Sequence, residues 1–488
     1  MHDGKVLERM MMLQSHLFID GHWIPGSEER YLDVINPANG EVEGRVAHAS
    51  RYDMDRALAA AERGFKVWKE TSVFERSKIM RGAATLLRQR SEEIATLLVA
   101  QAGKPLAEAR LELASAADVL DWFSEEARRA YGRVISPRSS AVSQQVIKEP
   151  IGPAVGFTPW NFPVAQIVRK VGPALAAGCS IIIKGPEEAP AAPVEFFRCL
   201  HDAGVPAGVV GLLFGTPAEI SGYLVPHPTI RKVSFTGSVP VGKHLASVAG
   251  AHMKRATMEL GGHAPVIICA DANLELAADV LLTTKFRHAG QACVAPTRFL
   301  IERSVYSKFI QLYKARCENL IIGDGRDPAT TLGPLNSERR LATLQSLIED
   351  AVSKGATLEH GGRRVGTKGF FLEPTILSGV TPDMRVMNEE PFGPLALMVP
   401  FDSLDEAIDE ANRLPFGLAA YAWTADLRAA NKISRSVESG MISTNHFGLA
   451  IPETPYGGIK DSGIGSEGGL EAIEAYLNSK FVTQMDPA

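Results

Sequence analysis

The sequence predicts an α/β protein built around parallel β-sheets, and three observations support this fold class. From Ile151 onward, short apolar segments of strand length alternate with helical segments, a pattern typical of a doubly wound parallel sheet. A second run of alternating strands and helices begins near Pro265. The chain of 488 residues is too long for one simple core, so two or three domains are expected.

The N-terminal part of the chain is predicted to be helical and to lead into a β-ribbon. Apolar side chains recur at helical spacing in residues 53–70, with Asp53 near the N-cap, and again in residues 74–90, 91–102 and 106–131. The period then changes, because residues 133–135 and 142–148 have strand character and are separated by Pro- and Ser-rich turns. We expect the strands of a β-ribbon here.

The alternating region supplies the sheets. Buried strands are predicted at 180–183, 209–213 and 232–235, with helices at 193–203, 218–225 and 241–249. The second run includes strands at 298–301 and 395–400. Residues 477–484 also have strand character, and we expect that they can pair outside their own domain.

Composition and charge exclude several classes of partner. The net charge of −5 leaves no basic face for nucleic acid and no polybasic signal for a membrane surface. Five cysteines without a C-x-x-C pair indicate neither a disulfide framework nor a zinc site, so we expect a cytoplasmic protein without a metal. Residues 150–168 are uncharged, but four prolines within them favour a buried active-site segment over a membrane span.

Cys293 is the candidate nucleophile. An isolated cysteine is more often a small buried hydrophobic residue. Here Gly290 and Gln291 precede it, and Arg287 and His288 lie within two helical turns, which favours a partly exposed thiol. A thiol that attacks a carbonyl also needs a base, a site for the oxyanion and a hydride acceptor.

Glu259 and Asn161 are candidates for two of these functions. Glu259 comes just before a pair of glycines, so it is either a cap on a turn or a general base beside backbone that can approach a ligand closely. Asn161 lies between two prolines. It is either a turn residue or, together with the backbone N–H of Cys293, a donor to an oxyanion.

A cofactor site is less clearly marked. No G-x-G-x-x-G motif follows the strands predicted above, and residues 235–242 instead follow a predicted strand and open a helix whose N-terminus suits a pyrophosphate. The same turn is also an ordinary connection from strand to helix. Lys184 and Glu187 follow the strand residues 181–183, where they form either a solvated surface pair or a holder for the hydroxyls of an adenosine ribose.

Taken in order, these segments resemble the aldehyde dehydrogenase superfamily over essentially the full chain. The resemblance is carried by Trp160-Asn161-Phe162-Pro163, Lys184, Phe235-Thr236-Gly237-Ser238, Glu259-Leu260-Gly261-Gly262, Gly290-Gln291-Ala292-Cys293 and Glu390-Pro391-Phe392-Gly393-Pro394, a set that is highly specific as a whole. It implies that Cys293 is the nucleophile, Asn161 the oxyanion donor and Glu259 the base that hydrolyses a thioester. The family binds its cofactor without the Rossmann glycine fingerprint.

The resemblance also implies a cofactor, a domain plan and an oligomer. The cofactor is NAD, with NADP as the alternative, and no metal is required. The residues implied for cofactor binding are Thr158, Pro159, Trp160, Lys184, Glu187, Gly215, Phe235, Thr236, Gly237, Ser238, Leu260, Gly261, Glu390 and Phe392. A Rossmann-type NAD-binding domain would comprise residues 1–131 and 151–261, and an α/β catalytic domain residues 262–460. A β-ribbon and tail, residues 132–150 and 461–488, would join subunits into homodimers or homotetramers.

Within the superfamily, the chain is similar to the succinate-semialdehyde and α-ketoglutarate-semialdehyde dehydrogenases, through residues 168–179 and 285–287. This similarity implies that Arg169 and Arg287, in the segments that carry Asn161 and Cys293, bind an acidic group at the far end of the aldehyde. Succinate semialdehyde is the first candidate substrate. The alternatives are α-ketoglutarate semialdehyde, glutarate semialdehyde, sulfolactaldehyde, or a broad range of aldehydes.

The chain departs from this subgroup at two places. Residues 449–454 lack the serine pair that succinate-semialdehyde enzymes often carry, so a hydroxyl ligand for the substrate is missing. Position 295 is alanine, so a redox switch through a second cysteine is not expected. Two other functions stay open: transfer of the acyl group to CoA, which needs no hydrolytic base such as Glu259, and a binding protein that has lost the chemistry, against which the retained Cys293 and Asn161 argue.

Overall fold

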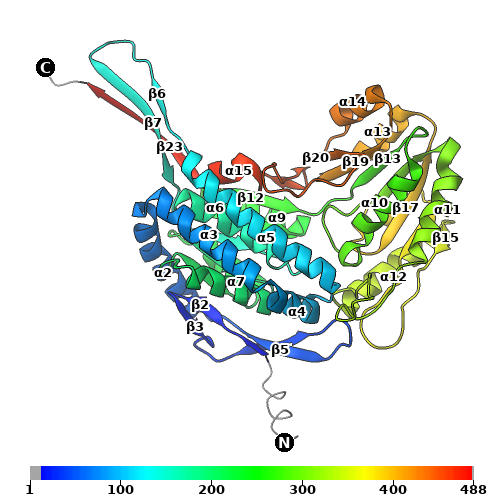
Figure 1. The fold of residues 1–488 in the computed structure, drawn as a ribbon, viewed down its shortest axis with the longest axis horizontal. Coiled ribbons are helices and arrows are strands. Elements are labelled where there is room, and N and C mark those ends of the chain that lie inside the picture. The colour runs from blue at the N-terminus through cyan, green and yellow to red at the C-terminus, as the bar shows by residue number, and fades with distance from the viewer. Residues whose placement is uncertain (1–12, 486–488) are drawn as a thin grey trace, which may run out of the picture.

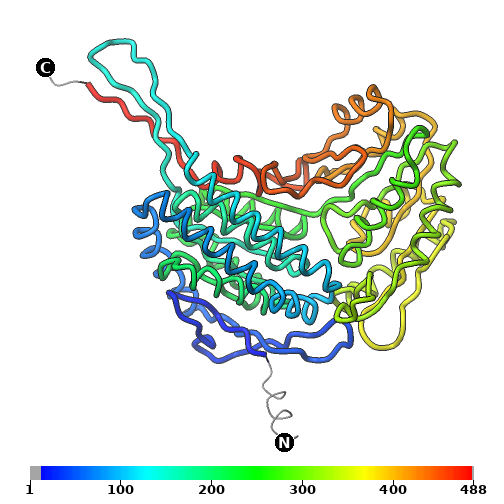
Figure 2. Tube along the Cα trace, viewed as in Figure 1, coloured from blue at the N-terminus to red at the C-terminus, as the bar shows by residue number. Residues whose placement is uncertain are grey.

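Two sheets of mainly parallel strands form the two halves of the molecule, and a β-ribbon projects from the first half (Figure 1). The computed structural model describes residues 13–485. Figure 2 shows that the chain crosses from the first half to the second near the middle of the sequence and returns at its C-terminal end. The predicted α/β fold class is confirmed.

The first sheet has eight strands, of which the five in the middle run parallel. In spatial order they are β22 (Gly463–Ile464), β12 (Arg255–Leu260), β11 (Lys232–Gly237), β8 (Ala154–Phe157), β9 (Ile181–Lys184), β10 (Val210–Leu213), β2 (Leu17–Ile19) and β3 (His22–Ile24). The helices of this half are α2 (Arg51–Glu70), α3 (Val73–Gln89), α4 (Ser91–Ala102), α5 (Leu106–Glu126), α6 (Ala165–Ala177), α7 (Ala191–Asp202), α8 (Pro217–Leu224), α9 (Val239–Ala251) and the short α15 (Gly469–Glu474).

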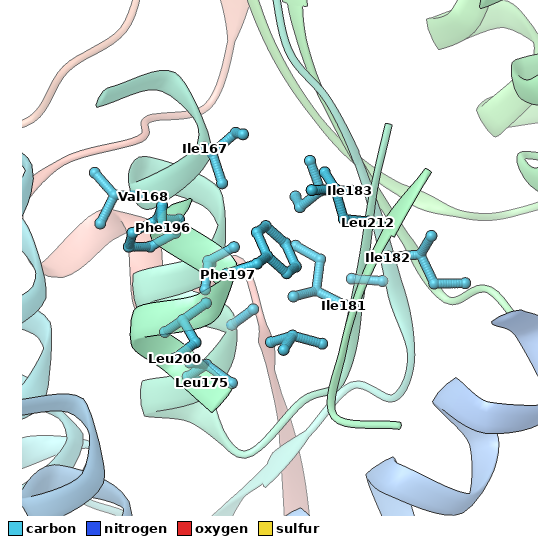
Figure 3. Close-up of a cluster of buried hydrophobic side chains, with 14 of the residues drawn as sticks. Ile167, Val168, Leu175, Ile181, Ile182, Ile183, Phe196, Phe197, Leu200 and Leu212 are labelled. Atoms are coloured by element: carbon cyan, nitrogen blue, oxygen red, sulfur yellow. The ribbon is translucent and has the colours of Figure 1, made fainter. Parts of the chain in front are cut away.

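The core of the first half lies around β9. Residues 181–183 of this strand are all isoleucine, because helices cover both faces of a parallel sheet. Figure 3 shows Ile181 and Ile183 on the side that faces Phe196 and Phe197 of α7, while Ile182 projects to the opposite side. All five side chains are buried. Their packing fixes the carboxyl end of β9, where Lys184 lies.

The second sheet has seven strands, and only the edge strand β15 runs antiparallel to its neighbour. In spatial order they are β15 (Thr357–His360), β16 (Thr375–Ser378), β17 (Leu395–Phe401), β14 (Arg298–Glu302), β13 (Pro265–Ile268), β19 (Ala419–Trp423) and β20 (Met441–Thr444). The helices here are α10 (Leu274–Phe286), α11 (Tyr306–Cys317), α12 (Glu338–Ser353), α13 (Leu404–Asn412) and α14 (Leu427–Ser436).

Three smaller β-elements complete the fold. A ribbon is formed by β6 (Arg133–Ile135), β7 (Val142–Pro150) and β23 (Leu477–Met485), and β23 pairs with β7 over its full length. A second sheet of three strands contains β1 (Leu13–Ser15), β5 (Val42–Ala47) and β4 (Tyr31–Ile35), and β18 (Phe416–Gly417) pairs with β21 (Ile459–Lys460). The C-terminal strand β23 is therefore part of the ribbon. The domain limits predicted from the sequence stay a prediction.

The structure differs from the sequence-based expectation at a few helix ends. The helix expected from residue 53 begins at Arg51, and Asp53 lies near its N-cap, Ser50, as expected: the Asp53 side chain returns a hydrogen bond to the Ser50 backbone in a capping box. The helix expected over residues 106–131 ends at Glu126 and is followed by a single 3₁₀ turn.

In the described part of the chain, no helix has the length and apolar character needed to cross a membrane.

Candidate active site

Cys293 lies between the two halves of the molecule, just after α10. The chain leaves α10 through a 3₁₀ turn in which His288, Ala289 and Gly290 have φ values of 49°, 52° and 72°. A Cβ atom on Gly290 would lie 2.2 Å from the carbonyl oxygen of Gly393, so only glycine fits this close approach. This left-handed turn brings the Cys293 thiol out of the core, and the residue is partly exposed.

Two cavities meet at Cys293. The first has a volume of about 240 Å³ and is lined by Phe162, Arg169, Arg287, Val294, Phe447, Leu449 and Ile451, among others. The second has a volume of about 200 Å³ and contains Asn161, Glu259 and Glu390. Gln166, Cys293 and Tyr456 line both cavities. A molecule in the first cavity can therefore reach the thiol and, across it, the second cavity.

Asn161 is buried and is held beside Cys293 at both ends. Its Nδ2 donates to the carbonyl of Gln291 at 2.9 Å, which leaves the second N–H of the amide for another acceptor. The backbone carbonyl of Asn161 accepts a hydrogen bond of 2.7 Å from the Nζ of Lys104. Lys104 is in turn ion-paired with Glu112, and both side chains are buried. The sequence analysis missed this Lys104–Glu112 support.

Glu112 also fixes the backbone that follows Asn161. Its Oε1 accepts hydrogen bonds from the N–H of Val164 at 3.0 Å and of Ala165 at 3.1 Å, at the start of α6. Asn161 is therefore anchored to Glu112 of α5 by the buried Lys104–Glu112 ion pair, in which each charge satisfies the other. A fixed amide is what electrostatic stabilisation of a developing charge requires.

Glu259 lies near the carboxyl end of β12 and is 3% exposed. Its Oε1 has no hydrogen-bond partner among the described residues. Burial raises the pKa of Glu259 well above its ordinary value, and the neighbouring carboxylate of Glu467 raises it further, whereas Lys170 and Arg169 oppose this. Glu467 itself accepts hydrogen bonds from the Nζ of Lys170 and the Oγ of Ser234, which hold its side chain in place.

The Cys293 thiol has one hydrogen-bond partner within residues 13–485, the hydroxyl of Tyr456, whose oxygen lies 3.3 Å from Sγ. Burial raises the pKa of Cys293 to about 11, and the Tyr456 hydrogen bond opposes that increase. The sequence analysis did not single out Tyr456. The available signal was its position before Gly457 and Gly458, where the backbone comes close to Glu259.

A third cavity, of about 550 Å³, continues from the second along the carboxyl ends of β8, β9 and β11. In open α/β sheets, this edge is where ligands bind. Most of the predicted cofactor residues line one or both of these cavities: Thr158, Pro159, Trp160, Lys184, Glu187, Phe235, Thr236, Gly237, Ser238, Leu260, Gly261, Glu390 and Phe392. Gly215 reaches the site through its N–H, which donates to Glu187 at 2.8 Å.

The shape and polarity of this edge fit a dinucleotide. Ser238 is the N-cap of the 13-residue helix α9, but its side chain does not cap the helix, so N–H groups at this end stay available for a phosphate. Glu187 accepts from the Nζ of Lys184 at 2.5 Å and can also accept from ribose hydroxyls. A Cβ atom on Gly261 would lie 2.2 Å from the carboxylate of Glu390, so glycine keeps this part of the site open.

In the second cavity, Glu390 and Phe392 lie near Cys293. Glu390 accepts a hydrogen bond of 3.2 Å from the N–H of Gly262, and burial raises its pKa to about 7. The ring of Phe392 packs edge-on against Trp160, with centroids 5.9 Å apart. Within the described range of the chain, no cluster of His, Cys, Asp or Glu is arranged to hold a metal ion.

The two predicted substrate arginines line the first cavity but differ in their contacts. Arg169 donates to the carbonyls of Ala450, at 2.9 Å, and Glu467, at 3.5 Å, and its Cζ lies 4.3 Å from the ring centroid of Tyr456. Arg287 lies over the ring of Phe162, with Cζ 4.6 Å from the centroid, and forms no ion pair or hydrogen bond with any described residue. Arg287 is thus a cation without a bonded counter-charge in a cavity that Glu108, Glu112 and Arg169 also line.

The chain is similar to known proteins over nearly its full length. A profile of the aldehyde dehydrogenase family matches residues 23–482. A putative 4-(hydroxymethyl)benzenesulfonate dehydrogenase of Comamonas testosteroni is 47% identical over 96% of this chain and 97% of its own length. A 3-sulfolactaldehyde dehydrogenase of Pseudomonas putida is 40% identical over 96% of this chain and 97% of its own. The crystal structure of succinate-semialdehyde dehydrogenase from Burkholderia pseudomallei superposes with a TM-score of 0.95, at 38% identity, over 97% of this chain and 98% of that one.

Proposed function

The chain belongs to the aldehyde dehydrogenase family, and we propose that it uses NAD⁺ to oxidise an aldehyde with an anionic group at its far end. The observation that carries this proposal is Arg287, which faces the aldehyde cavity without a bonded counter-charge. The donors of this guanidinium are free to bind an anion through charge-assisted hydrogen bonds, and their fork geometry suits a carboxylate or sulfonate. Succinate semialdehyde is the first candidate.

The positions of Cys293, Asn161 and Glu259 around one cavity support the following sequence of steps. The Cys293 thiolate adds to the aldehyde carbon, and the side-chain amide of Asn161 and the N–H of Cys293 hold the resulting oxyanion. When bound, NAD(P)⁺ supplies the acceptor for the hydride that leaves the same carbon, so that a thioester remains on Cys293. Glu259 then removes a proton from water, the hydroxide adds to the thioester carbon, and the carboxylic acid leaves as the thiolate is restored.

A second candidate is an aldehyde whose anionic group is a sulfonate. The relatives from Comamonas testosteroni and Pseudomonas putida are named for a benzenesulfonate and for 3-sulfolactaldehyde. The cavity has aromatic walls at Phe162, Phe447 and Tyr456, against which an aromatic ring can pack, and the loop 449–454 contributes no serine hydroxyl to select a short carboxylate. Both candidates place the negative charge at Arg287.

Replacing Arg287 by alanine is expected to lower kcat/KM for succinate semialdehyde by about tenfold to a hundredfold, because a charge-assisted hydrogen bond contributes about 1.5–3 kcal/mol. Activity on butanal, which has no anionic group, should change little. Arg169→Ala is expected to reduce both activities, because Arg169 also packs on Tyr456 beside the thiol. Steady-state kinetics with both aldehydes tests this. An equal loss on both aldehydes in Arg287→Ala would show that Arg287 holds the fold and would remove the support for an acidic substrate.

We also propose that NAD⁺ is preferred to NADP⁺. The Glu187 carboxylate can accept a hydrogen bond from the ribose 2′-OH and would repel a 2′-phosphate, while Lys184 partly offsets that repulsion. We expect kcat/KM to be about tenfold higher with NAD⁺, which corresponds to about 1.4 kcal/mol. Glu187→Gln should lower the ratio of kcat/KM with NAD⁺ to kcat/KM with NADP⁺. A higher kcat/KM with NADP⁺ in the unmodified protein would contradict the assignment.

The β-ribbon supports a proposal about assembly. It carries exposed apolar side chains, with Val134 88%, Phe481 55% and Met485 72% exposed, and an exposed strand edge of this kind favours pairing with another chain. We propose a homodimer or homotetramer joined through the ribbon. A monomer mass in light scattering would contradict this.

A further inference from the structure

The Tyr456 hydroxyl lies at the reactive sulfur, although none of the proposed reaction steps uses it. Tyr456 is 5% exposed, and its hydroxyl is the single side-chain group that hydrogen-bonds to the Cys293 sulfur in the described structure, at 3.3 Å. The side chain also borders both cavities that meet at the thiol. It therefore touches the reacting atom on the path between the aldehyde and the cofactor.

The direction of this hydrogen bond follows from the chemistry of the two groups. Burial raises the pKa of Tyr456 well above its ordinary value, so the phenol keeps its proton. A neutral thiol and a phenol can donate in either direction. A thiolate has no proton to donate, so once Cys293 is charged the phenol is the donor, and hydrogen bonds to charged acceptors are the stronger ones.

Apart from a hydrogen bond of the Cys293 backbone, the surroundings of the thiol other than Tyr456 raise its pKa and so oppose its ionisation. Burial is the largest cause of the raised pKa of Cys293, and the carboxylates of Glu259 and Glu390 add to it. Tyr456 is the side chain that acts against these effects. A donor at this position is therefore what an attacking thiolate in this site requires.

Tyr456 is also held in place. Its N–H donates to the Oγ of Ser466 at 2.9 Å, and its carbonyl accepts from the N–H of Glu467 at 2.8 Å. The guanidinium of Arg169 lies over its ring, 4.3 Å from the centroid. A cation over the ring face is attracted to the π-electrons and fixes the ring, so the hydroxyl stays directed at the sulfur.

We propose that Tyr456 is a further catalytic residue, whose hydroxyl donates a hydrogen bond to the Cys293 sulfur and stabilises the thiolate that attacks the aldehyde. The proposal rests on Cys293 being the nucleophile of the proposed function. It does not depend on which aldehyde is the substrate. Arg169 acts through Tyr456 as a positioning residue, in addition to its proposed contact with the substrate.

Tyr456→Phe tests the proposal, because it removes the hydroxyl and keeps the ring under Arg169. The chain offers a matched control in Tyr421→Phe: Tyr421 is also buried near Cys293, but its hydroxyl donates to the carbonyl of Val294 at 2.7 Å and not to the sulfur. The measurement is the rate of Cys293 alkylation by iodoacetamide against pH, followed by peptide mass spectrometry in the full-length protein. The other four cysteines are buried, and each gives a separate peptide signal.

In Tyr456→Phe, the midpoint of the alkylation profile is expected to rise by about 1 to 2 pH units, as loss of a hydrogen bond to a charged group implies. At neutral pH, kcat/KM should fall by about tenfold to a hundredfold, recover toward the unmodified value at high pH, and leave the Kd for NAD⁺ unchanged. Tyr421→Phe should keep the original midpoint.

Three results would overturn the proposal. An unchanged midpoint in Tyr456→Phe would show that the hydroxyl does not affect the thiolate, and a lowered midpoint would show that the thiol is the donor. An equal rise in Tyr456→Phe and Tyr421→Phe would show a general effect on packing. Failure of the proposed function itself is distinguishable, because the unmodified protein would then reduce no NAD⁺ with any of the candidate aldehydes, whereas the alkylation profiles would still report the hydrogen bond from Tyr456 to Cys293.

Discussion

Replacing Cys293 by alanine is expected to abolish aldehyde oxidation and to leave NAD⁺ binding nearly unchanged. The covalent step requires the thiol, and no other cysteine lines the cavities at the site. The side chain lies at the edge of the dinucleotide site, whose main contacts come from other elements, so the variant should bind NAD⁺ with a similar Kd. Initial rates with succinate semialdehyde and a fluorescence titration with NAD⁺ measure the two effects.

Substantial turnover in Cys293→Ala would contradict the assignment of the nucleophile. A large loss of NAD⁺ affinity would instead indicate that the substitution disturbs the turn before Cys293. The left-handed residues at 288–290 make this second outcome a useful check on folding.

Replacing Glu259 by glutamine is expected to separate the two halves of the reaction. The amide keeps the shape of the side chain but cannot take a proton from water, so the thioester should form and then persist. A stoichiometric burst of NADH followed by a weak steady state is the expected trace in stopped-flow absorbance. The burst serves as the internal control, since it reports an intact Cys293 and an intact cofactor site.

The same residue sets an expected pH dependence. Because burial and Glu467 raise the pKa of Glu259 well above its ordinary value, the group loses its charge as pH falls through that raised value. The deacylation rate of the unmodified enzyme should therefore fall with decreasing pH, and this dependence should be missing in Glu259→Gln. If neither the burst nor the steady state changes in the variant, Glu259 has a structural function only.

Most of the fold was predictable because its signals are local. The strand at 181–183 is apolar at every position, which is the pattern of a parallel strand covered on both faces, and β9 has that environment. The short strands of the N-terminal sheets were not predicted, because three residues are too few to show a period. The start of the first long helix is predicted at residue 53 and lies at Arg51, because both members of the capping box, Ser50 and Asp53, are typical of a helix N-terminus.

The site was predictable to the extent that its residues lie in distinctive motifs. Cys293, Glu259 and Asn161 each stand beside glycines or prolines that mark unusual backbone, and the structure brings all three to one cavity. Their supports do not carry such marks. Lys104 reaches Asn161 across 57 positions of the chain, and Tyr456 reaches Cys293 across 163, so only the folded structure shows these contacts.

The contacts of Arg169 could not be read from the sequence either. Spacing along α6 placed it near the aldehyde, and it does line that cavity. The carbonyls that occupy part of its guanidinium come from residues 450 and 467, almost 300 positions away. This is why Arg287 is expected to discriminate between charged and uncharged aldehydes more cleanly than Arg169.

We propose that Cys293 forms a thioester preferentially with an anionic aldehyde, a claim that can be tested by trapping the thioester. Glu259→Gln is mixed with NAD⁺ and equal concentrations of succinate semialdehyde and butanal, quenched within the burst, and digested for peptide mass spectrometry. We expect the peptide that contains Cys293 to carry mainly the succinyl group, with a mass gain equal to succinate semialdehyde less two hydrogens. A butyryl group in equal or greater amount, or an acyl group on any other residue, would contradict the claim.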